Sequence, residues 1–163
     1  MTSNYYIIDS SSLIELNRHN PIDLFPTVWE RIESLINKGR LIAPKEVLYE
    51  IKKGDDQLAR WAKRQSGLFK EPTLKQIEIL KDILKQYPSL VNENRQCDAD
   101  SWVIALAIEM APSSQKTLAP IKRIVVTEEK LRGDKIKIPL VCQKYNIESI
   151  DILDMFRIEG WKF

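Results

Sequence analysis

The chain has 163 residues, of which 44% are hydrophobic and 29% are charged, and its formal net charge is +2. These values exclude an intrinsically disordered chain, and so small a net charge does not by itself indicate a nucleic-acid partner. The length fits a single domain that buries roughly 70% of the surface of its unfolded chain. No apolar run approaches the roughly 20 residues that a membrane-spanning helix needs.

An apolar segment begins almost at the first residue, which leaves no room for a secretory signal peptide. The two cysteines, Cys97 and Cys142, do not have the spacing of metal ligands. Without a secretory signal, a disulfide between them is not expected. We therefore expect a cytoplasmic protein that is not attached to a membrane.

The first predicted element is a buried strand over residues 5–8, Tyr-Tyr-Ile-Ile. Continuous runs of β-branched and aromatic residues are typical of strands in parallel sheets. Asp9 and three serines follow, and Leu13 and Leu16 then begin a helix that ends near Asn20. Ligands of open α/β sheets bind at the carboxyl ends of the strands, so Asp9 lies where a functional residue is expected.

Helices and short apolar strands alternate along the rest of the chain. Pro26 fits the first turn of a helix, Gly39 fits a left-handed cap, and Pro44 opens another helix. This alternation predicts an α/β fold with a parallel sheet. Helices are predicted over residues 26–37, 44–54, 58–65, 74–86, 98–110 and 138–146, and strands over residues 40–43, 124–127 and 147–150.

Carboxylates follow each inner strand of the predicted sheet. Such a cluster repels itself unless a divalent cation binds in it or several of the acids are protonated. Oxygen ligands without paired His or Cys favour Mg²⁺ or Mn²⁺ over zinc. A metal held in this way can activate water and neutralise the charge of a phosphodiester. The carboxylates are Asp9, Glu46, Glu50, Asp98, Asp100, Glu128 and Glu129.

Most of these carboxylates also have a structural explanation. Asp9 could end its strand and bond the amides of the turn. Glu46 lies in the first turn of its helix, where an acid favours the helix dipole, and Asp98 is a natural N-cap. Glu128 and Glu129 alternate sides after the strand 124–127, so one of them could be a surface charge. The order of the acids along the chain, and no single acid, indicates a site.

For two of the carboxylates the structural explanation is weaker. Glu50 lies one helical turn beyond Glu46 and on the same face, where the helix dipole no longer explains an acid. Asp100 lies about 200° around its helix from Asp98 and shares a face with Val103, which directs it toward the sheet.

The chain resembles the PIN-domain ribonucleases, and among them the VapC-like toxins of prokaryotic toxin–antitoxin pairs. In that family a strand ending in Asp precedes small hydroxyl residues, and three further acids follow in a set order. The end of the chain looks like a less characterised PIN-like branch. Two features depart from the family: the fourth acid is Glu instead of Asp, and the insert at 55–89 is long. The matching segments are residues 7–14, 43–51, 100–107 and 126–129.

The resemblance implies one three-layer α/β/α domain over residues 1–163, with a short, mainly parallel sheet of about four to five strands. It implies a nuclease that hydrolyses single-stranded or loop RNA with a metal-bound water. A cognate antitoxin and a second copy of the chain are the protein partners it implies. The ligands of one or two Mg²⁺ or Mn²⁺ ions would be Asp9, Glu50, Asp100 and Glu129, supported by Ser11, Thr127, Glu46 and Asp98.

An acidic pocket repels phosphate, so an RNA enzyme needs basic residues beside it. In the basic segment 52–70 we expect Arg60, Lys63 and Arg64 to bind phosphates, and Trp61 could stack on a base. The alternative is that the basic residues form a solvated surface and that Trp61 packs the insert onto the domain. A second basic group contains Lys130, Arg132, Lys135 and Lys137.

Other functions fit the sequence less well. A phosphatase of the haloacid-dehalogenase type needs a second Asp two residues after the first, where this chain has Ser11. A response-regulator receiver needs paired acids on its first strand, and these are not evident. The alternative that remains is a PIN-like module that binds RNA or protein without cutting. The one histidine, His19, is expected at the surface and not as a general base.

Overall fold

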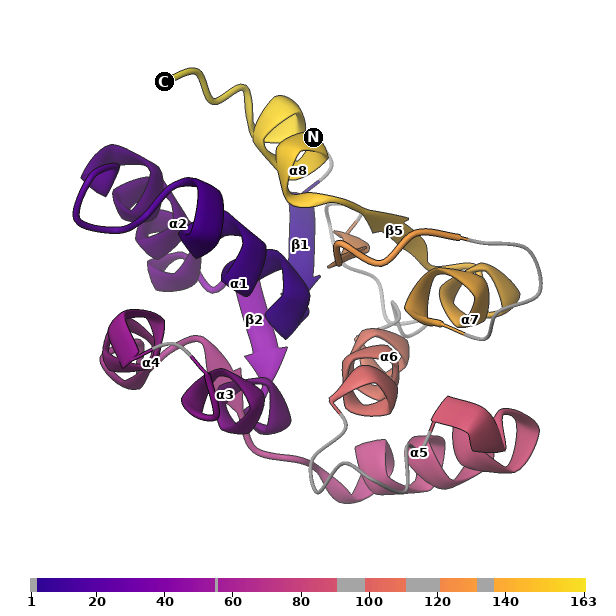
Figure 1. Ribbon diagram of the computed structural model, residues 1–163. Helices are drawn as coiled ribbons and strands as arrows, with labels where there is room; N and C mark the ends of the chain where they lie inside the picture. The colour runs from indigo at the N-terminus through magenta and orange to yellow at the C-terminus, as the bar shows by residue number, and fades with distance from the viewer. Residues whose placement is uncertain (1–2, 55, 91–98, 111–120, 132–136) are drawn as a thin grey trace.

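The structure is a computed structural model that describes residues 3–54, 56–90, 99–110, 121–131 and 137–163 (Figure 1). These residues form an α/β fold around a five-stranded sheet with the strand order β3-β2-β1-β4-β5. All neighbouring strands pair in parallel, which confirms the predicted fold class. The strands are β1 (Ser3–Ile8), β2 (Leu41–Pro44), β3 (Phe69–Lys70), β4 (Ile121–Val126) and β5 (Glu148–Ile150).

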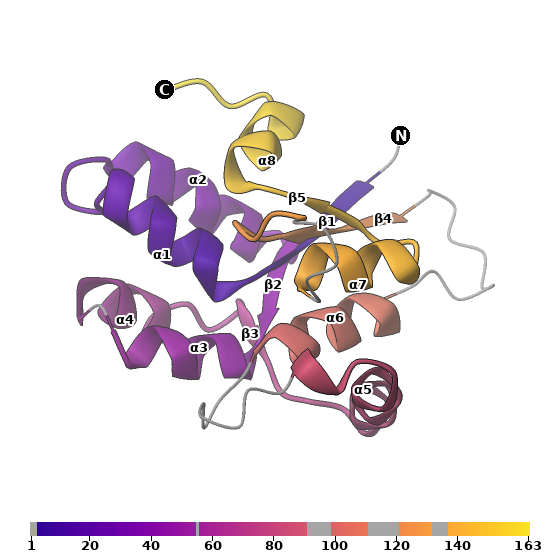
Figure 2. The same cartoon turned by 45° about the vertical axis from the view of Figure 1, so that its right-hand side comes forward.

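Helices cover both faces of the sheet and produce a three-layer α/β/α arrangement. Figure 2 shows α1, α2 and α8 on one side and α6 and α7 on the other, with α5 packed outside α6. No helix of the described ranges has both the length and the apolar composition to cross a membrane. The helices are α1 (Ser10–His19), α2 (Pro26–Asn37), α3 (Lys45–Lys52), α4 (Asp56–Lys63), α5 (Leu74–Gln86), α6 (Asp100–Glu109), α7 (Ile138–Lys144) and α8 (Ile152–Glu159), with a 3₁₀ turn at Pro88–Leu90.

Strand β1 is the central strand, and its second half is apolar on both faces. Its last three residues are fully buried. It pairs with β2 on one side and along its whole length with β4 on the other, from Ser3 opposite Ile121 to Ile8 opposite Val126. Since β1 and β4 end in register, the residues that follow the two strands lie side by side at the carboxyl edge of the sheet.

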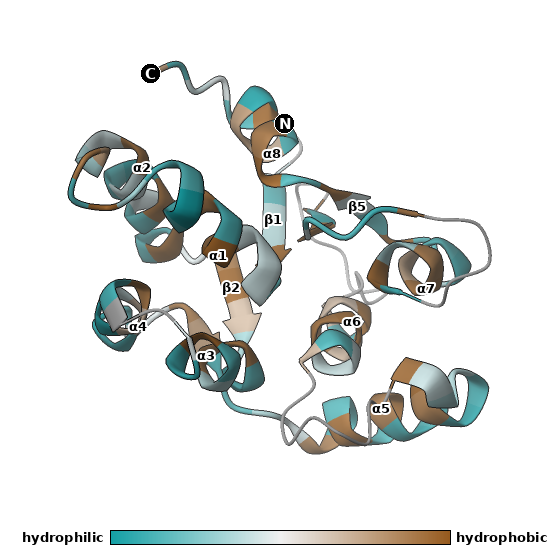
Figure 3. Ribbon diagram, in the orientation of Figure 1, coloured by the Kyte–Doolittle hydropathy of each residue, from teal (hydrophilic) through white to brown (hydrophobic). Residues whose placement is uncertain are grey.

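The helices are of two kinds, which differ in how their hydrophobic residues are distributed around the helix. Helices such as α2 and α7 are amphipathic, with hydrophilic residues on one side and hydrophobic residues on the other (Figure 3). Helix α6 is apolar around most of its circumference, and the residues from Val103 to Ala107 are buried. A helix of that kind has to be covered on all sides. It lies between the sheet and α5, as the prediction of a core helix requires.

The predicted elements agree with the observed ones except at some ends. Helix α5 has the predicted bounds, and Gly39 has the left-handed φ of +69° that was expected after α2. Helix α6 begins at Asp100, and the residue before it, Ala99, has helical dihedral angles. The N-cap role and the supporting role of Asp98 stay predictions. Asp98 itself lies outside the described residues.

The sequence analysis missed β3 and α8. Strand β3 has two residues, which is too short to show a hydrophobic period. Helix α8 has residues typical of helix caps at both of its ends. The Asp151 side chain accepts a hydrogen bond from the Asp154 amide at 2.9 Å, and Gly160 ends the helix with a φ of +72°. These are an N-cap and a left-handed C-cap.

Trp61 on α4 packs inside the protein and does not face solvent. It is 1% exposed, its ring meets that of Trp29 edge-on at 4.8 Å, and its Nε1 donates to Glu33 Oε1 at 2.8 Å. The prediction that Trp61 stacks on a base is therefore wrong, and the alternative, that it packs the insert onto the domain, is correct. The three basic residues around it are exposed: Arg60, Lys63 and Arg64.

Helix α8 is attached to the sheet by a polar cluster around Glu159, whose side chain is only 10% exposed. Its Oε2 accepts a hydrogen bond from the Tyr6 hydroxyl at 2.6 Å and an ion pair from Arg40 Nη2 at 2.7 Å. Arg40 Nε also donates to the Asn4 carbonyl at 2.9 Å. Burial, together with the Glu159 carboxylate, raises the pKa of Tyr6, so the phenol stays a hydrogen-bond donor at neutral pH.

We predict that Glu159→Ala lowers the free energy of unfolding by about 2–4 kcal/mol, because it leaves the buried Tyr6 hydroxyl and the Arg40 guanidinium without their acceptor. Urea denaturation followed by far-UV circular dichroism measures the change. The matched control is Glu148→Ala, which removes an exposed carboxylate paired with Lys122 at 2.6 Å. Its effect should stay below about 1 kcal/mol. Equal losses in both variants would contradict an anchoring role for Glu159.

Candidate functional site

Asp9 is a buried carboxylate at the carboxyl edge of the sheet. It follows β1, is 2% exposed, and caps α1 by accepting a hydrogen bond from the Ser10 amide at 2.8 Å. Its other oxygen accepts hydrogen bonds from Ser11 Oγ at 2.8 Å and from Thr127 Oγ1 at 3.1 Å. Asp9 therefore bonds an amide of the turn, as its structural explanation expects, and Ser11 and Thr127 lie where supporting hydroxyl groups were expected.

Two other carboxylates act on Asp9. Burial is the main reason that the pKa of Asp9 is raised to about 6, and the charges of Glu129 and Glu50 raise it further. The hydrogen bonds from Ser11 and Thr127 lower the pKa and only partly offset these effects. Carboxylates from the ends of β1 and β4 and from α3 are therefore close enough to repel each other, and a bound cation would relieve that repulsion.

Glu50 joins three helices beside Asp9. Its Oε2 accepts a short hydrogen bond from Ser10 Oγ, and its Oε1 accepts one from the Ala99 amide at 2.7 Å. Glu50 thus caps the amino end of α6 from another helix, which explains why α6 has no capping side chain of its own. Asp100, half-buried, is the first residue of α6, next to the amide that Glu50 binds.

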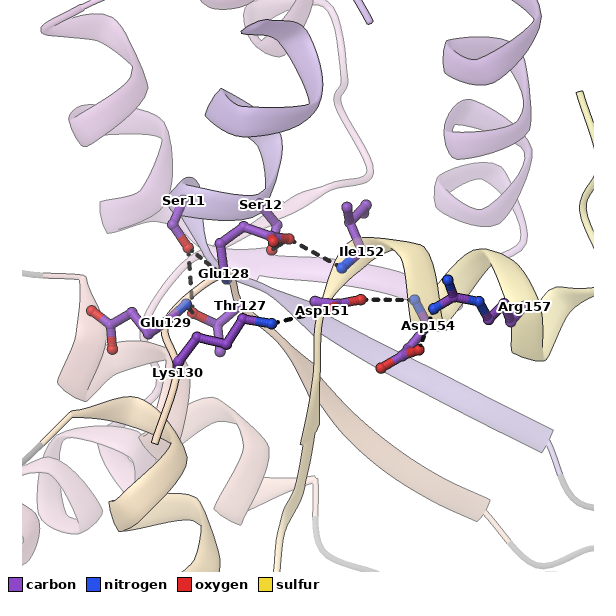
Figure 4. Close-up of polar contacts among 10 residues, drawn as sticks. All are labelled: Ser11, Ser12, Thr127, Glu128, Glu129, Lys130, Asp151, Ile152, Asp154 and Arg157. Atoms are coloured by element: carbon purple, nitrogen blue, oxygen red, sulfur yellow. Dashed lines mark hydrogen bonds and ion pairs between the residues drawn. The ribbon is translucent and has the colours of Figure 1, made fainter. Parts of the chain in front are cut away.

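Glu128 and Glu129 point to different sides of the segment after β4 (Figure 4). Glu128 Oε1 accepts hydrogen bonds from Ser12 Oγ at 3.2 Å and from the Ile152 amide at 3.1 Å, so it joins α1 to α8. Glu129 Oε2 accepts a hydrogen bond from the Ile138 amide at 3.0 Å. Only Glu129 of the two acts on the pKa of Asp9. Both are half-buried, so neither is a plain surface charge.

Glu46 does not lie with the carboxylates around Asp9. It lies in the first turn of α3, as predicted, and burial raises the pKa of its carboxyl. The charges that act on Glu46 are those of Glu71 and Lys45 and not those around Asp9. Its Oε2 is buried and has no hydrogen-bond partner within the described residues. The structure therefore does not bring Glu46 to the carboxylates around Asp9.

The oxygen ligands around Asp9 have the chemistry that Mg²⁺ and Mn²⁺ prefer. In the ranges that the structure describes, however, no three Asp, Glu, His or Cys side chains converge closely enough to hold a metal ion. Protein donors occupy the carboxylates instead: Ser10 and Ala99 bind Glu50, and Ile138 binds Glu129. Each carboxylate oxygen keeps a further lone pair, so metal binding would require Glu50 and Glu129 to move closer to Asp9 but not to give up these donors.

A sequence comparison identifies the family. A family model described as "Domain of unknown function (DUF4411)" matches residues 6–163. The chain belongs to the DUF4411 family. No curated protein is similar to the chain in sequence. The match contains Asp9, Glu50, Asp100 and Glu129, so all four predicted ligands lie inside the DUF4411 domain.

Two cavities of the DUF4411 domain lie beside the hydroxyl groups that bind Asp9, and both are lined by Glu129 and Lys130. The larger has a volume of about 490 Å³ and also includes Ser11, Glu15, Glu128 and Lys137. The smaller, of about 230 Å³, includes Thr127 and Asp151. Two members of the second basic group therefore lie next to the acids. The other two, Arg132 and Lys135, lie outside the described residues.

Two side chains of types that often take part in catalysis, His19 and Cys142, lie away from the carboxylates around Asp9. The side chain of His19 is 71% exposed and contacts Glu15 at 3.2 Å, which confirms the predicted surface position. Cys142 on α7 is buried, and burial raises the pKa of its thiol to about 12. A thiol that stays protonated at neutral pH is a poor nucleophile, so Cys142 is a packing residue.

We predict that Asp9→Asn stabilises the metal-free protein at neutral pH. A pKa raised from 3.8 to about 6 means that the ionised carboxylate opposes folding by about 3 kcal/mol above pH 6. The penalty falls as pH drops through about 6 and disappears below about 3.8, where Asp9 is protonated in both states. The variant should therefore be more stable by about 1–3 kcal/mol at about pH 7.5, and by roughly half as much at about pH 5.

Urea denaturation of both proteins in EDTA at the two pH values measures the difference. The control is Glu148→Gln, which neutralises an exposed carboxylate that is paired with Lys122. Its difference from the wild type should change little between the two pH values. An Asp9→Asn protein that is less stable than the wild type at both pH values would contradict the predicted cost of burying the ionised carboxylate.

Proposed function

We propose that this DUF4411 protein is a Mg²⁺- or Mn²⁺-dependent endoribonuclease. The observation that carries the proposal is the placement of Asp9: a carboxylate at the edge of the central strands whose pKa is raised mainly by burial and further by the charges of Glu129 and Glu50. A site of this kind gains stability from a divalent cation. The proposed ligands are Asp9, Glu50, Asp100 and Glu129.

The protein's own residues would position the reacting groups. Ser11 and Thr127 fix the orientation of the Asp9 carboxylate through hydrogen bonds to one of its oxygens. Glu50 and Glu129 approach Asp9 from α3 and from the end of β4, and the two cavities lie beside Ser11 and Thr127, where substrate could enter. The cation, when bound, would supply a water of lowered pKa and neutralise the phosphodiester.

The order of the acids, which resembles that of VapC-like PIN domains, supports a role as the toxin of a prokaryotic toxin–antitoxin pair. On this proposal the protein acts in the cytoplasm, its substrate is RNA, and its protein partners are a small antitoxin and a second copy of the chain. Growth arrest on expression that Asp9→Asn abolishes is the expected cellular result.

A second candidate is a PIN-like module that binds RNA or protein without cutting it. One observation favours it: in the described part of the chain the carboxylates are bound by Ser10, Ala99 and Ile138, and no three of them converge. Metal affinity separates the two candidates, because a module without catalysis has no need to bind the cation.

We predict that the wild-type protein cleaves a mixed pool of single-stranded RNA with Mg²⁺ or Mn²⁺ and not with EDTA. Asp9→Asn and Asp100→Asn should each lower the rate at least about a hundredfold, because each removes a proposed ligand. The measurement is the appearance of products with 5′-phosphate ends on denaturing gels. Glu148→Gln is the control and should cut at the wild-type rate. Cutting that survives both Asp variants would contradict the assignment of the site.

We also predict that Mn²⁺ or Mg²⁺ stabilises the wild-type protein and not Asp9→Asn. A ligand at a hundred times its Kd raises the free energy of unfolding by about 2.7 kcal/mol. Thermal unfolding over a series of metal concentrations measures the shift and the Kd together. Equal shifts in the two proteins would mean that the cation binds elsewhere, and no shift in either would favour the binding module.

A further inference from the structure

A nuclease has to hold the phosphates on either side of the bond that it cuts, and carboxylates alone repel them. The larger cavity beside Asp9 is lined in part by positively charged side chains that could bind these phosphates. Lys130 and Lys137 line it together with Ser11 and three carboxylates, those of Glu15, Glu128 and Glu129. Ser11 is hydrogen-bonded to Asp9, and the Glu129 amide donates to Thr127 Oγ1, which itself donates to Asp9, so the cavity wall continues into the carboxylate site.

Lys130 lies at the rim between the acids and α8 (Figure 4). Its Nζ is 3.5 Å from Asp151 Oδ2, and its side chain is 65% exposed. An exposed ion pair of this length contributes little to stability, so the ammonium can exchange Asp151 for a phosphate at small cost. Asp151 keeps a separate function meanwhile, because its Oδ1 caps α8. Lys130 is thus held near the site without being bound tightly.

Lys137 faces the same cavity from the start of α7. It is exposed and precedes Ile138, whose amide donates to Glu129 at 3.0 Å. The backbone that places Lys137 is therefore fixed to the proposed ligand Glu129. Lys130 follows Glu129 directly in the chain. The backbone positions of both lysines are therefore tied to Glu129, one by the peptide bond and the other by the hydrogen bond from Ile138.

The size of the cavity fits one nucleotide and not a duplex. Its volume of about 490 Å³ is within the range of roughly 300–1,000 Å³ that holds a small ligand. A single unstacked nucleotide is the unit by which proteins usually read RNA strands. The basic residues of α4 have a weaker case, because neither cavity beside Asp9 includes them and Trp61 is buried.

We propose that an RNA strand crosses the Glu129–Lys130 segment, with one nucleotide in the larger cavity and with Lys130 and Lys137 bound to phosphates flanking the scissile one. This inference rests on the proposed nuclease function and assigns its substrate path to the side of β4, α7 and α8. Lys130 and Lys137, and not the basic residues on and after α4, then form the main phosphate-binding surface.

The test uses charge removal without charge reversal: Lys130→Met, Lys137→Met and the double variant. Each is combined with Asp9→Asn, so that binding is measured without cleavage. Fluorescence anisotropy with a labelled, mixed-sequence single-stranded RNA gives the Kd over a series of salt concentrations. The double variant should bind at least about tenfold more weakly, and the slope of log Kd against log salt should fall by about 1.4, or about 0.7 for each lost phosphate contact.

Two controls make the result specific. Lys122→Met removes an exposed lysine near the other end of β4, and Lys63→Met with Arg64→Met removes charge from α4. Both should leave the Kd and the salt slope unchanged. A loss of affinity in the α4 variant with none in the Lys130 and Lys137 variants would overturn the inference, and so would equal losses in all variants.

Cleavage assays separate this inference from the proposed function. In otherwise wild-type protein, the two lysine variants should raise KM more than they lower kcat, because phosphate contacts outside the reacting bond bind substrate and transition state alike. A protein that cuts RNA while the lysine variants bind normally would overturn this inference alone. A protein that binds RNA through the lysines but never cuts it would overturn the nuclease function alone.

Discussion

The constraint that organises the structure is the burial of the Asp9 carboxylate where the two central strands end, which the fold accommodates at a cost in stability. A buried charge is tolerated only when polar groups surround it. Strands β1 and β4 end in register, so the Ser11 and Thr127 hydroxyl groups both reach one oxygen of Asp9 while the Ser10 amide binds the other. The turn after β1, the start of α1 and the end of β4 are therefore fixed by the same side chain.

The fold was predictable because its physical signals are local. Continuous apolar runs identified β1, β2 and β4, and helical spacing with proline and glycine ends identified most helices. Strand β3 could not be predicted, because it has two residues and exists only through its pairing with Ala43 and Pro44 of β2. Helix α8 was not predicted, although local signals mark both of its ends: Asp151 as the N-cap and Gly160 as the left-handed C-cap.

The sequence predicted which acids lie at the candidate site but not the direction in which each side chain points. The order of the acids placed Asp9, Glu50 and Glu129 at one edge, and the pKa of Asp9 shows that they interact. Whether a carboxylate faces its neighbours or a helix end depends on contacts distant in the chain. The bond from Ala99 to Glu50, 49 residues apart, is such a contact. The burial of Trp61 against Trp29 depends likewise on how the insert folds back.

The pairing of β1 with β4 has a consequence for how the chain folds as it is made. Ser3 leaves the ribosome early, but its partner Ile121 emerges only after most of the domain has been synthesised. At roughly 5–20 residues per second, one edge of an apolar strand then stays without its partner for several seconds or more. Strand β2 can pair with the other edge much sooner, through Tyr6 and Leu41. Thr127 and Glu129 emerge later still, so the groups around Asp9 are complete only after β4 has been synthesised.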